Sequence, residues 1–123
     1  MEKLTIEQLI ARKDHRRPET KLVHLDSLGG DLEIKKIDPM RYMDFSDRIE
    51  KADGLGEAVR VNYELIYACC PILHNQQLQD AYECRDPLEI VPKLLDDNIA
   101  EMNQVVAEIA TFYGLDLTDD VKN

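Results

Sequence analysis

Cysteine and histidine are the residue types in this chain that come closest to a chemical site. Cys69, Cys70, His74 and Cys84 occur in one stretch, and thiolates and imidazoles are common zinc ligands. Zinc modules present their ligands in close pairs on turns, whereas here Cys70, His74 and Cys84 would have to converge across the turn at Pro71. We therefore expect no metal site and no cofactor.

Nucleophilic catalysis is the second chemistry that this stretch offers. Cys70 and His74, four residues apart, supply a thiol and a base, but nothing local indicates the oxyanion hole or the strained turn of a catalytic nucleophile. His24 is expected on the surface or edge of a hairpin, and His15 in a loop. We expect no catalytic residue, and an enzyme that uses Cys70 and His74 stays as a third hypothesis.

Carboxylate pairs and glycines give weaker signals. Asp96-Asp97 falls at a predicted helix junction and Asp119-Asp120 in a polar tail, where capping and solvation explain acids better than acid–base catalysis. The stretch "LGGDLE" at residues 28–33 lacks the lysine and the following helix of a phosphate-binding loop. The function is therefore expected to lie in the surfaces of the protein.

The length and composition are those of one compact domain. The 123 residues are 44% hydrophobic and 33% charged, so we expect a single domain over residues 1–123, with a frayed acidic tail at 115–123. No apolar run is long enough to span a membrane, and the amphipathic N-terminus differs from a secretory signal. Three cysteines, two of them adjacent, make a poor disulfide framework. We expect reduced thiols and a cytoplasmic location.

The negative charge is concentrated in the second half of the chain. Residues 1–60 have a net charge of −1 and residues 61–123 a net charge of −9, which together give the total of −10. Such a field repels phosphate backbones and favours solubility, so we expect no nucleic-acid partner. A local basic cluster is interpreted as a solvated helix end and loop: Arg12, Lys13, His15, Arg16 and Arg17.

The first third of the chain predicts a helix followed by a hairpin. Thr5 and Gln8 have the spacing of a capping box at the start of a short amphipathic helix. "TKLVHL" (20–25) and "DLEIKKI" (31–37) read as strands on either side of "DSLGGD", in which two glycines supply positive backbone angles. A lone hairpin is marginally stable in water, so one face must pack on helices.

The rest of the chain predicts helices separated by capping signals. Asp38-Pro39 and Asp86-Pro87 each pair an N-cap carboxylate with a proline at the first helical position. Helices are expected after Asp38, from Glu57 to the turn at Pro71, from Asn75 through Tyr82, after Asp86, and finally over residues 99–113, the longest. The fold class is α+β, mainly α, with about five or six helices and one β-hairpin near the N-terminus.

The predicted apolar faces follow helical spacing. They contain Tyr42, Phe45, Ile49 and Ala52 in the first long helix; Ala58, Val61, Leu65, Ala68 and Cys69 in the second; and Ile99, Met102, Val106, Ile109 and Tyr113 in the last.

This order of elements resembles a family of phage proteins. The hairpin with "SLGGDLEIKKIDP", the aliphatic-proline turn at Cys70 to Leu73, the passage "LQDAYECRDPLEIVPKLL" and a closing helix that ends in "FYG" (112–114) together resemble tail assembly chaperones of the XkdN-like type. The likeness covers nearly the whole chain and rests on apolar and turn residues rather than on a catalytic signature.

The resemblance implies a non-enzymatic role in virion assembly in the cytoplasm of a bacterial host. Proteins of this kind are thought to coat the tape measure protein and keep it soluble until the tail tube polymerises around it. The implied partners are the tape measure protein and the tail tube protein, without nucleic acid or membrane. A homo-oligomer and a phage or prophage origin are left open. No partner-binding residue transfers, because no binding motif of the family can be matched to positions of this sequence.

The alternative function comes from another class. An acidic regulatory protein that mimics DNA and blocks a nucleic-acid-binding enzyme would also carry a large negative charge. It requires a continuous stripe of acids, which the scattered N-cap aspartates do not favour.

Overall fold

The hairpin near the N-terminus is formed by strands β1 (Thr20–Leu25) and β2 (Gly30–Lys35). The computed structural model describes residues 2–15 and 19–115 of the chain. The strands are antiparallel, with Val23 opposite Leu32 and Leu25 opposite Gly30. A 3₁₀ turn, η2 (Asp26–Leu28), connects them, and Gly29 has a φ of 63°. The prediction of two glycines with positive φ was wrong, because the 3₁₀ turn needs only one left-handed residue to close.

Helices α2 (Pro39–Glu50) and α3 (Leu55–Cys69) follow the hairpin and pack against each other. The Asp38 side chain accepts a hydrogen bond from the Met40 amide at 2.8 Å, so the predicted N-cap is confirmed. Helix α3 begins two residues earlier than expected, because Gly54 serves as its N-cap. It is therefore the longest helix of the described residues, which corrects the prediction that residues 99–113 form the longest one.

The remaining helices are short except for the last. They are η3 (Pro71–His74), α4 (Gln76–Ala81), η4 (Pro87–Glu89), α5 (Ile90–Leu94) and α6 (Ile99–Thr111). Asn75 and Asn98 cap α4 and α6 through their side-chain oxygens. Asp86 and Glu89 form a full capping box, but it opens a 3₁₀ turn that leads into α5. The fold is α+β and mainly α, with one hairpin near the N-terminus, as predicted.

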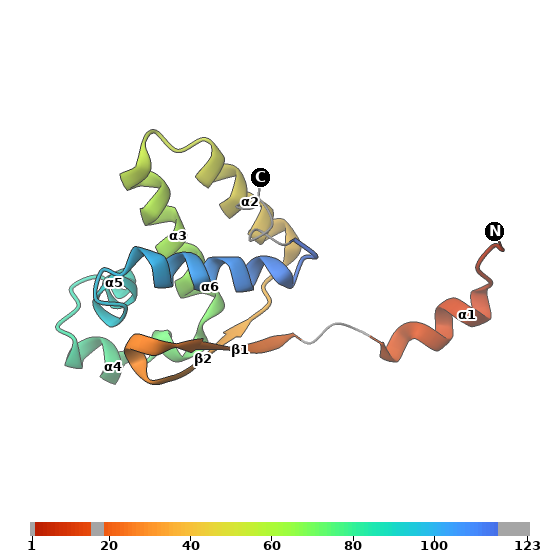
Figure 1. Cartoon of the computed structure of the whole chain (residues 1–123), viewed down its shortest axis with the longest axis horizontal. Helices are drawn as coiled ribbons and strands as arrows, with labels where there is room; N and C mark the ends of the chain where they lie inside the picture. The colour runs from red at the N-terminus through yellow and green to blue at the C-terminus, as the bar shows by residue number, and fades with distance from the viewer. Residues whose placement is uncertain (1, 16–18, 116–123) are drawn as a thin grey trace.

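The core lies between the inner face of the hairpin and helices α2, α3, α5 and α6 (Figure 1). Val23, Leu25, Leu32 and Ile34 point into it from the two strands, so one face of the hairpin packs on helices, as predicted. In α6 the buried residue is Val105 and not Val106, and Ile99 is 44% exposed. The buried face of α6 therefore differs in part from the predicted stripe, of which Met102 and Ile109 are buried.

The N-terminal segment stands outside this core. Residues 2–15, here called the arm, contain α1 (Ile6–Ala11) and the 3₁₀ turn η1 (Arg12–Asp14), and no residue of either is buried. Figure 1 shows the arm apart from residues 19–115, here called the body. The predicted capping box is confirmed, because the Gln8 amide donates to Thr5 Oγ1 at 3.2 Å and the Thr5 amide donates to Gln8 Oε1 at 2.9 Å.

Candidate protein-binding surface

The cysteine and histidine residues that the sequence singled out do not form a common site. Cys69 and Cys70 are fully buried, and burial raises the pKa of both thiols to about 12. Cys84 is partly buried, and all three cysteines are free. Across residues 2–15 and 19–115, no group of three or more Cys, His, Asp or Glu side chains is arranged to hold a metal ion.

His74 is held by the end of α3 rather than by a thiol. Its Nε2 donates a hydrogen bond to the Tyr67 carbonyl at 2.7 Å, and its ring lies against the Tyr67 ring with centroids 4.3 Å apart. A buried thiol with a raised pKa is a poor nucleophile, since the thiolate is the reactive form. Cys70 and His74 therefore lack the activated pairing that thiol catalysis requires.

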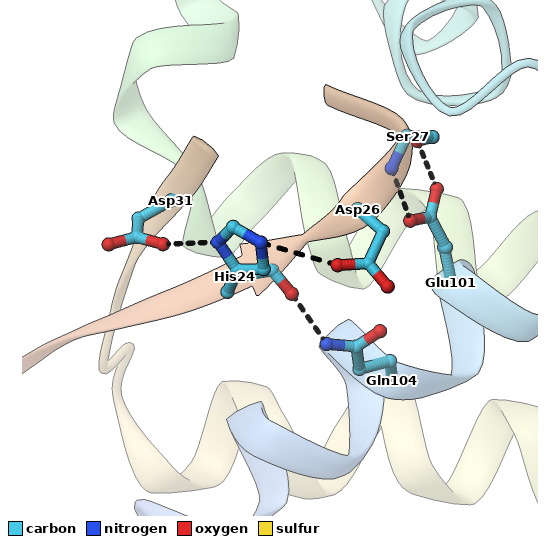
Figure 2. A network of polar contacts seen from close by, with 6 residues as sticks. All are labelled: His24, Asp26, Ser27, Asp31, Glu101 and Gln104. Atoms are coloured by element: carbon cyan, nitrogen blue, oxygen red, sulfur yellow. Dashed lines mark hydrogen bonds and ion pairs between the residues drawn. The ribbon is translucent and has the colours of Figure 1, made fainter. Parts of the chain in front are cut away.

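The hairpin is attached to α6 through polar contacts at its turn (Figure 2). The backbone amide of Ser27 donates to Glu101 Oε2 at 3.2 Å, and the Ser27 hydroxyl donates to the other carboxylate oxygen. Gln104 Nε2 donates to the His24 carbonyl at 2.7 Å. Glu101 is 8% exposed, so its partners satisfy a carboxylate that is largely removed from water. Sequence analysis missed this contact, which joins residues 74 positions apart.

His24 lies on the outer side of the hairpin between two carboxylates, as Figure 2 shows. Its Nδ1 is 2.9 Å from Asp31 Oδ1 and its Nε2 is 3.3 Å from Asp26 Oδ1. The hydrogen bond to Asp31 raises the pKa of the imidazole above its usual value of 6.5. Its exposure agrees with the prediction of a surface residue, and its two contacts link Asp26 of the turn to Asp31 of β2.

The predicted carboxylate pair at Asp96-Asp97 also has a local structural explanation. Both residues have positive φ, 53° and 57°, in the turn between α5 and α6. Aspartate tolerates this left-handed conformation better than most residues. Asp119-Asp120, the acidic tail from residue 116 onward, and Arg16 and Arg17 of the basic cluster lie outside the described residues.

The apolar face of the arm has no role within the chain. Four aliphatic side chains on and beside α1 are 53–71% exposed: Leu4, Ile6, Leu9 and Ile10. Burying such side chains is worth about 1.5–3 kcal/mol each, so leaving them in water is costly. A helix of this length is also marginal by itself, because isolated helices shorter than roughly 12–15 residues are barely stable in water. The arm thus has the properties of a segment that binds another surface.

A groove in the body is the second exposed apolar feature. It has a volume of about 470 Å³ and lies between the start of α2 and the end of α6. Its lining residues are Lys36, Pro39, Met43, Phe112, Tyr113 and Gly114. A smaller hollow of about 270 Å³ shares Lys36 and Pro39 with it and reaches Glu19 and Asp38.

Tyr113, which lines the groove, is held by several contacts. Tyr113 stacks on Tyr42 with ring centroids 4.0 Å apart, and its hydroxyl donates to the Ile37 carbonyl at 2.9 Å and accepts from the Ile37 amide at 3.0 Å. Lys36 lies over the Tyr113 ring, with Nζ 5.6 Å from the centroid. Met43, which lines the groove, is 54% exposed, and Met40 in the first turn of α2 is 71% exposed. Flexible thioether side chains of this kind are common on adaptable binding surfaces.

Comparison with protein-family models, curated proteins and solved structures found no match in any of the three. Over the part of the chain that the structure describes, no helix is long and apolar enough to cross a membrane.

Proposed function

We propose that this chain is a non-enzymatic tail assembly chaperone of a phage or prophage, which binds the tape measure protein in the host cytoplasm and keeps it soluble until the tail tube polymerises. The observation that carries the proposal is the arm, a capped amphipathic helix whose whole apolar face is exposed. Such a helix binds other helices through apolar residues at helical spacing. The sequence resemblance supplies the identity of the client.

The chemistry of the body supports a binding role in preference to catalysis. The buried thiols have raised pKa values, and the ring of His74 is engaged by Tyr67. The net charge of −10 favours dispersal of a complex that carries an aggregation-prone client.

The distribution of acids is less suited to a mimic of DNA. Asp38 and Asp86 cap helices, Glu101 binds the hairpin turn, and Glu64 and Glu108 pair with Arg48 and Lys21 at 2.7 Å each. These acids lie on separate elements and are engaged within the chain, whereas a mimic needs a continuous stripe that is free for a basic partner.

Co-expression with the neighbouring tape measure protein tests the proposal. We expect the wild-type chain to raise the soluble fraction of the tape measure protein, and Leu9→Asp in the arm to abolish this effect. Leu55→Asp is the matched control, because Leu55 is an 86% exposed leucine in the body, outside both the arm and the groove. Failure of the wild-type chain to solubilise the tape measure protein would count against the proposal.

Pulldown of the tagged chain from cells that express the neighbouring genes separates the two function classes. A long helical protein is the expected partner. Recovery of a basic DNA-binding protein, with binding that weakens steeply as salt is raised, would favour the mimic instead.

A further inference from the structure

The arm and the groove are complementary features of the same chain that do not meet within it. Figure 1 shows the arm apart from the body, although it joins the body on the side where α2 begins and α6 ends. The smaller hollow, which shares Lys36 and Pro39 with the groove, is lined in part by Glu19, the first described residue of the body. In one copy of the chain, the apolar face of the arm and the groove are therefore both exposed to solvent.

We infer that the arm of one copy docks in the groove of a second copy, and that the two copies exchange arms reciprocally. A two-fold dimer makes this contact twice, because each copy contributes one arm and one groove. The apolar side of α1 then covers Met43, Phe112 and Tyr113, and Leu9 and Ile10 leave water.

The charges of the two surfaces are compatible with this exchange. The arm holds three acids and three bases and is net neutral, so the entire net charge of −10 lies on the rest of the chain. Docking an arm therefore adds no net charge to an acidic body, whereas two bodies placed face to face repel each other. Electrostatic repulsion between the bodies therefore favours a dimer in which the copies meet through their arms.

Charged residues of the arm and beside the groove suggest one orientation for the docked arm. Glu7 is in the first turn of α1, and Arg12 and Lys13 follow its last turn. In the body, Lys36 precedes the first turn of α2 and the exposed Asp44 lies in its second turn. An arm that lies along α2 with Glu7 toward Lys36 places its two bases near Asp44. Opposite charges at both ends fix one orientation.

Molar mass measured by light scattering over a range of protein concentrations tests the exchange. Purified wild-type chain should reach twice the 14.2 kDa mass of one copy as the concentration rises. Leu9→Asp in the arm and Met43→Asp in the groove should each raise the dissociation constant of the dimer at least tenfold, given the free energy of burying one such side chain. Leu55→Asp introduces the same charge elsewhere and should leave the constant unchanged.

A cysteine pair identifies the occupant of the groove. One chain carries Leu9→Cys and a differently tagged chain carries Met43→Cys, both with Cys84→Ser to remove the partly exposed thiol. Mixing them under mild oxidation should give a disulfide-linked product that contains both tags. In a single chain with both cysteines, a bond formed only within that chain would overturn the inference of a second copy.

Three further results would overturn it. These are a single-chain mass at all concentrations, a dimer that neither Leu9→Asp nor Met43→Asp weakens, and no product with both tags. The measurements use the purified chain alone, so they do not depend on the identity of the client. The client and the groove would compete for the same face of the arm. Met43→Asp keeps the arm intact and releases it from the groove, so it should still solubilise the tape measure protein, and the exchange and the proposed function therefore fail separately.

Discussion

The imidazole of His24 links the strands and the turn of the hairpin through Asp31 and Asp26. Because the pKa of His24 is raised in the folded state, its protonated form adds stability that is complete below the unfolded value of about 6.5 and is lost as pH rises through the folded pKa. We expect the NMR titration midpoint of the His24 ring to fall in Asp31→Asn. Identical midpoints in the two proteins would contradict a stabilising role for Asp31.

The thiols differ in reactivity because their burial differs. Burial raises the pKa of Cys69 and Cys70 to about 12, whereas Cys84 is partly exposed. Alkylation of the folded protein near pH 8, followed by mass spectrometry, should give one rapid modification at Cys84 and very slow modification at the other two. Unfolding in denaturant should make all three react at similar rates. Rapid labelling of Cys70 in the folded protein would revive the thiol-enzyme hypothesis.

At the scale of elements, the contact between Glu101 and Ser27 attaches the hairpin to α6. Glu101→Ala removes a largely buried acceptor of two hydrogen bonds and should lower the free energy of unfolding by about 2 kcal/mol, as expected for hydrogen bonds to a charged group. Ser27→Ala should cost less, because the Ser27 amide still donates to Glu101.

A double-mutant cycle measured by urea denaturation separates this contact from other effects. The two substitutions together should cost less than the sum of the single costs, with a coupling of about 1 kcal/mol, because they remove a shared interaction. Asn98→Ser preserves a capping oxygen at the start of α6 and is a control that should change stability little. Strict additivity of Glu101→Ala and Ser27→Ala would mean that the carboxylate does not hold the turn.

At the scale of the whole molecule, the arm and the core should respond differently to substitution. Leu65 in α3 is 1% exposed, and Leu65→Ala should lower the free energy of unfolding by about 2–5 kcal/mol. Leu9→Asp, at a concentration where single copies prevail, should change it by less than about 0.5 kcal/mol, because the arm buries nothing in its own chain. Chemical denaturation followed by circular dichroism measures both values. A large loss of stability in dilute Leu9→Asp would show that the arm packs on its own body.

The sequence by itself determined the local structure of this protein. The capping signals at Thr5, Asp38 and Asn75 predicted the starts of their helices, and residues 20–25 were predicted to form a strand of a hairpin with one buried face. These signals work because a cap or a two-residue period acts between neighbours in the chain. Signals between neighbouring residues do not fix the length of a helix, and α3 begins two residues before the start that its apolar face indicated.

Only the tertiary structure decided which side of each element is covered. Val105 is buried and Ile99 is half exposed because of how α6 crosses the hairpin and α3, and Cys70 is buried although it lies beyond the predicted face of α3. The groove joins Lys36 to Tyr113, and the turn contact joins Ser27 to Glu101. The exposure of the arm has the same origin. A helix that packs in the core and a helix that binds a partner have the same apolar stripe in their sequences. The stripe shows that this face must be buried, but the packing of the other elements decides whether the chain itself or a partner covers it.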